Sequence, residues 1–352
     1  MNRLSLTLLL IPALVQAQTD KPPVDSLNQA QMQEIFHQLQ SKSLTAPRLT
    51  DEELNRAAIQ GLLQRLGTGA SLLPIETTPP PARKLISELF NTNIAYLRPA
   101  TFTVEEIPRL DVSLDSLAKS TATTLVLDLR APAAQSDPIA ATQFLSRFLP
   151  DATPLFQVRK AGEEKPRAFV TKGKPRWSKA LLLLVDSETN NAAETIAAVL
   201  QQKLHCYLIG SPTPGHAIEY RLQPVSPTHQ LRIAQSEVIL EGGRSIFGQG
   251  LQPDLIANMA PDVKNKQFNE SETSGMKRFA YETERPHMNE AALVAQTNPE
   301  LGYQIAKSAN QTTQFDIPAA NDAVLQQAID FLTAQDFLKL GLPPEERKAE
   351  PK

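Results

Sequence analysis

Residues 180–218 read ALLLLVDSETNNAAETIAAVLQQKLHCYLIGSPTPGHAI, and this stretch decides the fold. The continuous apolar run Leu181–Val185 predicts a strand that is buried on both faces. An alanine-rich face over Ala192–Leu200 predicts a helix, and Cys206–Ile209 predicts the strand after it. A strand, a polar turn, a helix and a second strand, followed by a Gly/Pro loop, indicate an α/β unit in which the helix packs on a sheet.

The segments on either side repeat this alternation. Asp137 and Pro138 predict the start of another helix, because Asp accepts hydrogen bonds from the first helical amides and Pro needs no amide partner there. Leu155–Lys172 alternates around a charged turn and predicts a surface hairpin. The predicted strands outside the first stretch are Asn93–Pro99, Thr124–Leu129, Glu219–Gln223 and Leu231–Leu240. The predicted fold class is therefore α/β.

The first residues carry the features of an export signal. Arg3 supplies a positive charge, Leu4–Ile11 forms most of an apolar run, and Val15-Gln16-Ala17 fits a cleavage site for small residues. The run is too short to span a bilayer. We therefore predict a signal peptide over residues 1–17 and an exported protein, periplasmic or secreted, without a transmembrane segment.

Residues 18–75 are predicted to form an N-terminal helical region. One helix is expected over Asn28–Ser41. A second is expected from Thr50, where Glu53 three residues later completes a capping box.

The C-terminal third carries weaker signals. The polar stretch Lys264–Glu284 is expected to be mobile or loosely packed. Asp322–Leu332 is expected to be helical, because its apolar residues share one face. The tail, residues 341–352, is expected to be disordered.

Composition excludes several classes of function. The 352 residues are 41% hydrophobic and carry a net charge of −3, which gives no electrostatic basis for binding nucleic acid or an anionic membrane. The five histidines match no metal-ligand spacing, so no metal and no cofactor are expected. The single Cys206 cannot form an internal disulfide.

Two motifs outside the first stretch give the chain a family likeness. Residues 242–254 read GGRSIFGQGLQPD, and residues 128–130 read Asp-Leu-Arg at the end of a predicted strand. With residues 180–218 they resemble the C-terminal processing, or tail-specific, serine peptidases of family S41. The residues that match the family pattern are Asp128, Arg130, Gly243, Arg244, Ser245, Ile246, Gly248, Gly250, Pro253 and Asp254. The resemblance implies structural roles for them, with glycines that allow tight turns and an arginine suited to pairing with a carboxylate.

The resemblance implies a ClpP/crotonase-like core over residues 93–262, followed by an extension with helices over residues 263–340. Most members of the family carry a PDZ domain before the core, where it binds the C-terminal carboxylate of the substrate. The segment between Leu73 and Ile94 is too short for such a domain. Residues 76–92 are therefore predicted to be a linker, and the PDZ domain is expected to be absent.

The reactive positions of the family fall on residues of other types in this chain. The nucleophilic serine falls at Asn191, and the lysine base falls 25 residues later at His216. A glutamine of the family falls at Tyr220, and the glycine pair of the oxyanion loop falls at Ala133 and Ala134. A carboxamide offers no nucleophilic hydroxyl, and Asn191 is expected to cap the following helix instead. No catalytic residue is therefore expected.

The expected function is that of a secreted, catalytically inactive relative of these peptidases. Such a protein would bind a peptide or a protein, for example an active paralogue that it regulates, and an oligomer is compatible with the sequence. Two alternatives stay open. In the first, the chain is an active serine-type endopeptidase whose nucleophile has moved to Ser187 or Thr189, with His216 as the base. In the second, it is a structural subunit of the cell envelope.

Overall fold

The structure is a computed structural model, and it describes residues 27–42, 50–75, 83–90, 93–131, 137–216, 218–280, 297–309 and 321–341. The predicted signal peptide and the tail from residue 342 lie outside the described residues. The chain divides into two compact units, Met1–Arg65 and Leu66–Lys352, and each is described by itself.

The described part of the first unit consists of α1 (Gln29–Lys42) and α2 (Asp51–Leu66). The predicted capping box is confirmed: Thr50 Oγ1 accepts a hydrogen bond from the Glu53 amide, and Glu53 Oε2 accepts one from the Thr50 amide, both at 3.3 Å. Neither helix buries a residue. These two helices therefore lack a hydrophobic core of their own.

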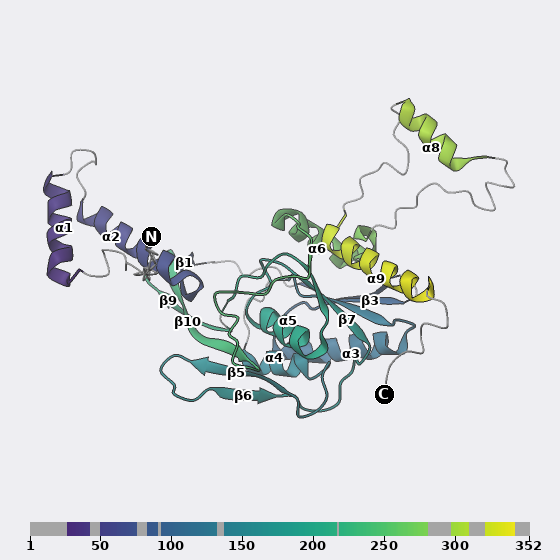
Figure 1. The fold of residues 1–352 in the computed structure, drawn as a ribbon, viewed down its shortest axis with the longest axis horizontal. Helices are drawn as coiled ribbons and strands as arrows, with labels where there is room; N and C mark the ends of the chain where they lie inside the picture. Colours follow the sequence, from purple (N-terminus) through teal and green to yellow (C-terminus); the bar gives the residue numbers. More distant parts are fainter. Residues whose placement is uncertain are drawn as a thin grey trace, which may run out of the picture. The chain divides into compact units, whose positions relative to one another are not determined.

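The centre of the second unit is a six-stranded sheet with the order β11-β8-β7-β4-β3-β2. Figure 1 labels β3 and β7 of this sheet. All neighbouring strands pair in parallel except β2, which runs antiparallel to β3. The strands are β2 (Ile86–Phe90), β3 (Ile94–Arg98), β4 (Thr124–Asp128), β7 (Ala180–Val185), β8 (Tyr207–Gly210) and β11 (Leu255–Ile256). The predictions of β3, β4, β7 and β8 are confirmed. The linker prediction is wrong for residues 86–90, which form β2.

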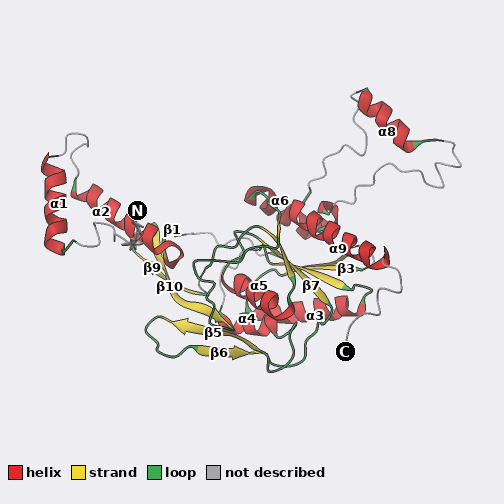
Figure 2. Cartoon of the chain, viewed as in Figure 1, coloured by secondary structure: helices red, strands yellow, loops and turns green. Residues whose placement is uncertain are grey.

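Helices cover both faces of this sheet (Figure 2). Because successive strand residues point to opposite faces, Leu125 and Leu127 join one hydrophobic cluster, and Val126 joins the other. The first cluster includes residues of α3 (Ile107–Lys119), α4 (Pro138–Leu145) and α5 (Asn191–Leu204). The second includes residues of α6 (Pro261–Ser274) and α9 (Ala323–Gly341). This two-sided burial explains why the central strands are apolar throughout.

A second sheet of five strands is antiparallel. Its longest strand, β10, pairs with β1, β5 and β9. The strands are β1 (Ala70–Pro74), β5 (Pro154–Lys160), β6 (Arg167–Val170), β9 (Glu219–Pro224) and β10 (His229–Leu240). The hairpin predicted over residues 155–172 is confirmed as β5 and β6. β9 begins soon after His216, so this sheet holds one end of the loop that carries that residue.

The C-terminal part is more tightly packed than its polar composition suggests. α6 buries Lys264, Gln267, Phe268 and Ser271, so the expected loose packing is wrong for residues 264–274. Residues 281–284 of the same stretch lie outside the described residues. The helix predicted over residues 322–332 is confirmed by α9, and a further helix, α8 (Pro299–Ser308), precedes it. Among the described residues, no helix is both long and apolar enough to cross a bilayer.

Candidate functional site

Asn191 is the first residue of α5 and has a left-handed backbone with φ of 50°. Asn is one of the few residues besides Gly that adopts this conformation readily. The N-cap position belongs to the extended Asn190, whose side chain makes no capping hydrogen bond. The prediction that Asn191 caps the helix is therefore wrong, because a cap needs extended backbone angles and Asn191 lies one residue inside the helix.

The turn between β7 and α5 is built by two polar side chains. Asp186 Oδ1 accepts hydrogen bonds from the amides of Glu188, at 2.8 Å, and Thr189, at 3.1 Å. The Thr189 hydroxyl accepts from the Asp186 amide at 2.9 Å and donates to the Leu129 carbonyl at 3.0 Å. Thr189 is therefore occupied in holding the end of β4 to this turn.

Glu194, one turn into α5, holds the loop that carries His216. Its buried carboxylate accepts hydrogen bonds from the amides of Gly215, at 2.7 Å, and His216, at 2.8 Å, and from the Thr213 hydroxyl. Burial raises the pKa of Glu194, while these three hydrogen bonds act in the opposite direction. The first turn of α5 and the loop at residues 213–216 are thus joined through one side chain.

The His216 ring packs edge-on against Tyr220, with 5.9 Å between ring centroids. Burial, with a smaller contribution from Arg232, lowers the pKa of His216 to about 4. Its Nδ1 atom is buried and has no hydrogen-bond partner among the described residues. The imidazole is therefore neutral at pH 7 and accepts a proton poorly there. No hydrogen bond in the described structure joins this ring to Ser187, whose side chain is exposed, or to Thr189.

Tyr220 anchors the far end of the same loop. Its hydroxyl donates to the Thr68 carbonyl at 2.9 Å, and the Arg232 guanidinium lies 4.4 Å from its ring centroid. At the position where the family resemblance implies a glutamine, the structure thus has an aromatic side chain that ties the loop to the antiparallel sheet.

Two glycines of the 242–254 motif, Gly248 and Gly250, pack backbone against backbone with this loop. A Cβ atom on Gly250 would lie 2.0 Å from the Thr213 carbonyl oxygen, and one on Gly215 would lie 2.6 Å from the Gly250 nitrogen. The Gly248 amide donates to the Gly215 carbonyl at 2.8 Å. These contacts leave no room for side chains, which explains why small residues stand at both places.

Other residues of that motif fasten neighbouring strands. Asp254 Oδ2 accepts from the Leu208 amide at 2.8 Å, which ties the motif to β8. Ser245 donates to Glu237 Oε2 at 2.5 Å. Pro253 and Gly243 lie in connecting segments. Arg244 is exposed and forms no ion pair within the described residues, so its expected pairing with a carboxylate is not found.

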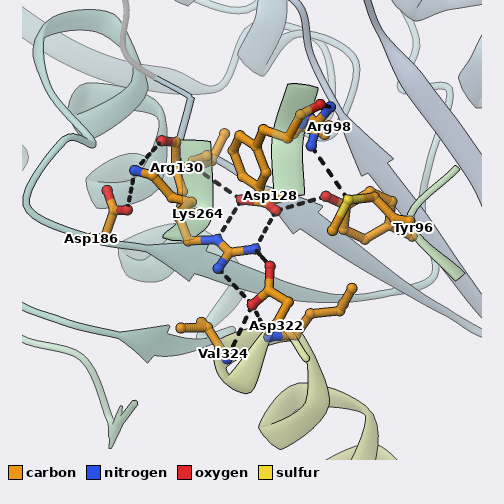
Figure 3. Close-up of polar contacts among 12 residues, drawn as sticks. Tyr96, Arg98, Asp128, Arg130, Asp186, Lys264, Asp322 and Val324 are labelled. Atoms are coloured by element: carbon orange, nitrogen blue, oxygen red, sulfur yellow. Dashed lines mark hydrogen bonds and ion pairs between the residues drawn. The ribbon is translucent and has the colours of Figure 1, made fainter. Parts of the chain in front are cut away.

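Arg130 and Asp128 form a buried cluster with a third charged residue (Figure 3). Arg130 Nη2 lies 2.7 Å from Asp128 Oδ2 and 2.7 Å from Asp322 Oδ2, and the Tyr96 hydroxyl donates to Asp128 at 2.7 Å. Burial alone would raise the pKa of Asp128, but Arg130 and the hydrogen bonds hold it below its ordinary value. Sequence analysis missed Asp322, whose only local signal is its place before α9.

Two predicted features receive no test from this geometry. Ala133 and Ala134 lie outside the described residues, so the altered oxyanion loop stays a prediction. Within the described residues, no group of His, Cys, Asp and Glu side chains is arranged to hold a metal ion. The carboxylates of Asp186 and Glu188, in the turn between β7 and α5, instead pair with a lysine: Lys264 Nζ lies 2.5 Å from Asp186 Oδ2 and 2.6 Å from Glu188 Oε2.

Comparisons with known proteins agree with this architecture. The family model for peptidase family S41 matches residues 93–257. The carboxy-terminal processing protease CtpA of Bacillus subtilis is 26% identical over 201 residues, which are 57% of this chain and 42% of the relative. The carboxyl-terminal-processing protease of Synechocystis is 23% identical over 178 residues, 50% of this chain and 41% of the relative. This chain therefore covers less than half the length of either relative.

A solved structure shows the same fold. The crystal structure of a candidate peptidase from Parabacteroides merdae superposes with a TM-score of 0.51 at 12% identity. The superposition covers 68% of this chain and 85% of the other. It extends the likeness beyond the segment that the family model matches.

Proposed function

Since this chain belongs to peptidase family S41 through residues 93–257, we propose that it binds peptides or unfolded protein segments around residue 191 without cleaving them. One observation carries the proposal. The position that the resemblance assigns to the family nucleophile holds Asn191, which has a left-handed backbone at the start of α5. A carboxamide there lacks the hydroxyl that attacks a peptide carbonyl.

The proton acceptor is also unsuited to catalysis. With a pKa of about 4, His216 is a weak base at neutral pH. The alternative of a displaced nucleophile finds no support in the geometry. Thr189 directs its hydroxyl proton to the Leu129 carbonyl, and Ser187 makes no hydrogen bond with the His216 ring.

The support for binding is that several backbone contacts hold the loop that carries His216 in place. Glu194, Gly215 and Gly250 hold the loop of His216 against α5 and the glycine motif through backbone contacts. An extended peptide that adds to a sheet edge is held by main-chain hydrogen bonds and needs no nucleophile. Loss of the reactive groups therefore leaves recognition intact.

We propose that the protein acts outside the cytoplasm. The predicted signal peptide would place the protein in the periplasm or outside the cell, where it would compete with or regulate an active relative by holding the same substrates. A purely structural envelope subunit would instead show no affinity for peptides.

Binding is tested with the full chain and fluorescein-labelled, unfolded β-casein, followed by fluorescence anisotropy and by gel analysis of the same samples. We expect saturable binding and an intact substrate. The variant Gly250→Ala, which disturbs the loop without changing residue 191 or 216, should bind more weakly. Absence of binding by the wild-type chain would contradict the proposal and favour the structural subunit.

A further inference from the structure

Lys264 is a buried lysine of α6 whose side chain contacts Arg130 and Asp186 (Figure 3). Its side chain is 2% exposed, and its Nζ atom donates to the Arg130 carbonyl at 3.0 Å and to Asp186 Oδ2 at 2.5 Å. It also forms an ion pair with Glu188 at 2.6 Å, without hydrogen-bond geometry. The residue lies beyond the segment that the family model matches.

The three partners of Lys264 belong to the two turns that lead into the site. Arg130 follows β4 and precedes the predicted oxyanion loop, whereas Asp186 and Glu188 form the turn between β7 and α5. Asp186 uses its other oxygen, Oδ1, to accept from the amides that shape this turn. Lys264 therefore cross-links the ends of two neighbouring parallel strands.

A second C-terminal helix, α9, begins next to the same arginine. Asp322, immediately before α9, accepts from Arg130 Nη1 at 2.9 Å and from Nη2 at 2.7 Å. Its Oδ1 also accepts from the amides of Val324 and Leu325, which caps α9. Two helices thus contact Arg130 independently, one at its carbonyl group and the other at its guanidinium group.

We propose that α6 and α9 form a C-terminal strap, and that Lys264 is a positioning residue that fixes the spacing between the turn after β4 and the turn after β7. A buried ammonium group is costly unless charged partners compensate it, and here two carboxylates and a carbonyl do so. The consequence for peptide binding rests on the proposed function. The cross-link itself does not.

The charges predict how the strap responds to substitution. Lys264→Met keeps much of the side-chain length but leaves Asp186 and Glu188 as uncompensated neighbouring carboxylates, so the turn at residues 186–189 should loosen. Adding Asp186→Asn removes one of these charges and retains an oxygen that accepts from the Glu188 and Thr189 amides. The double variant relieves this unpaired charge but still lacks the contact between residue 264 and the Arg130 carbonyl, so it should recover only part of the lost order.

Hydrogen–deuterium exchange of the full chain tests the cross-link. In Lys264→Met we expect exchange at least about tenfold faster in peptides that cover residues 128–131 and 186–191, with other strands unchanged. The matched control is Lys203→Met, which removes the ion pair of Lys203 with Glu241 on another part of the surface. Exchange equal to that of the control, or a uniform acceleration across the protein, would overturn the proposal.

A milder variant covers the case in which Lys264→Met does not fold. Glu188→Gln removes the more exposed partner and should accelerate exchange in the same two segments by a smaller factor. Unchanged exchange in both segments would also count against the strap.

The binding consequence is measured separately with fluorescein-labelled β-casein. Lys264→Met should raise Kd about tenfold, the double variant with Asp186→Asn should restore it only in part, and Lys203→Met should leave it unchanged. If the wild-type chain binds no casein, the proposed function fails while the exchange result still decides the strap. If casein binds but Kd is the same in Lys264→Met, the positioning role is contradicted.

Discussion

At the residue scale, the sequence reveals which residues occupy positions 191 and 216, but not the backbone conformation of Asn191 or the pKa of His216. The amide at position 191 and the imidazole at position 216 are visible in the sequence once the family pattern is aligned. The left-handed backbone of Asn191 is seen only in the structure, and the low pKa of His216 results from burial and from Arg232. Arg232, which contributes to that pKa, lies on β10 and has no sequence signal that links it to position 216.

The pKa of His216 predicts a pH dependence of stability. The folded-state pKa of about 4 lies below the ordinary value of 6.5, so between these values the unfolded chain binds more protons than the folded one. Stability should therefore fall as pH drops from 6.5 towards 4. Because the ring is partly exposed, the expected loss is about 1–2 kcal/mol.

Urea unfolding at pH 7 and at pH 4.5 measures this loss of stability, with His216→Gln as the comparison. The variant should lose less stability than the wild type over the same interval. An equal loss in both proteins would show that the ring titrates normally.

The glycine motif gives a second residue-level prediction. Gly250→Ala should lower the free energy of unfolding by about 3 kcal/mol, because its Cβ atom would meet the Thr213 carbonyl and its φ of 67° is left-handed. Gly243→Ala is the matched control, with φ of 81° and open space around the added atom, and should cost about 1 kcal/mol. Urea unfolding of both variants checks this, and equal losses would rule out the proposed backbone contact.

At the scale of elements, the buried strands were predictable and two other elements were not. Continuous apolar runs identified β4 and β7, because strands covered by helices on both sides need apolar side chains on both faces. The strand β2, with sequence ISELF, is short and contains Ser87 and Glu88. Nothing local distinguishes it from the Pro-rich segment before it.

The helix α6 was missed for a different reason. Its buried residues Lys264, Gln267, Phe268 and Ser271 have helical spacing, but three of the four are polar. Their partners, such as Arg98 and Arg130, lie more than a hundred residues away in sequence. A hydrophobic pattern therefore does not reveal this face.

The docking of α9 gives a prediction at the same scale. Asp322→Ala should lower the free energy of unfolding by about 3–5 kcal/mol, because it removes one partner of a buried ion pair and the cap of the helix. Asp330→Ala, at an exposed position of α9, is the control and should cost less than about 0.5 kcal/mol. Chemical denaturation measures both, and a cost below about 1 kcal/mol for Asp322→Ala would show that the pair is not needed for docking.

At the scale of the whole molecule, the family-matched segment is not a self-contained unit. β2 precedes residue 93, and α6 and α9 follow residue 257, yet all three contribute residues to the second hydrophobic cluster. We therefore propose that the folded core extends from β2 through α9, which is wider than the boundaries of 93–262 expected from the sequence. The family resemblance indicated the centre of this core but not its edges, because the edge elements join the core through contacts with residues that are distant in sequence.

The most direct measurement is a count of new peptide N-termini released from unfolded β-casein, by isotope labelling and mass spectrometry, for the wild-type chain, Asn191→Ala and Ser187→Ala. The expected result is no cleavage above the buffer control by any of the three proteins, while the wild type still binds the substrate. Turnover by the wild type that survives Asn191→Ala and disappears in Ser187→Ala would contradict the absence of peptidase chemistry.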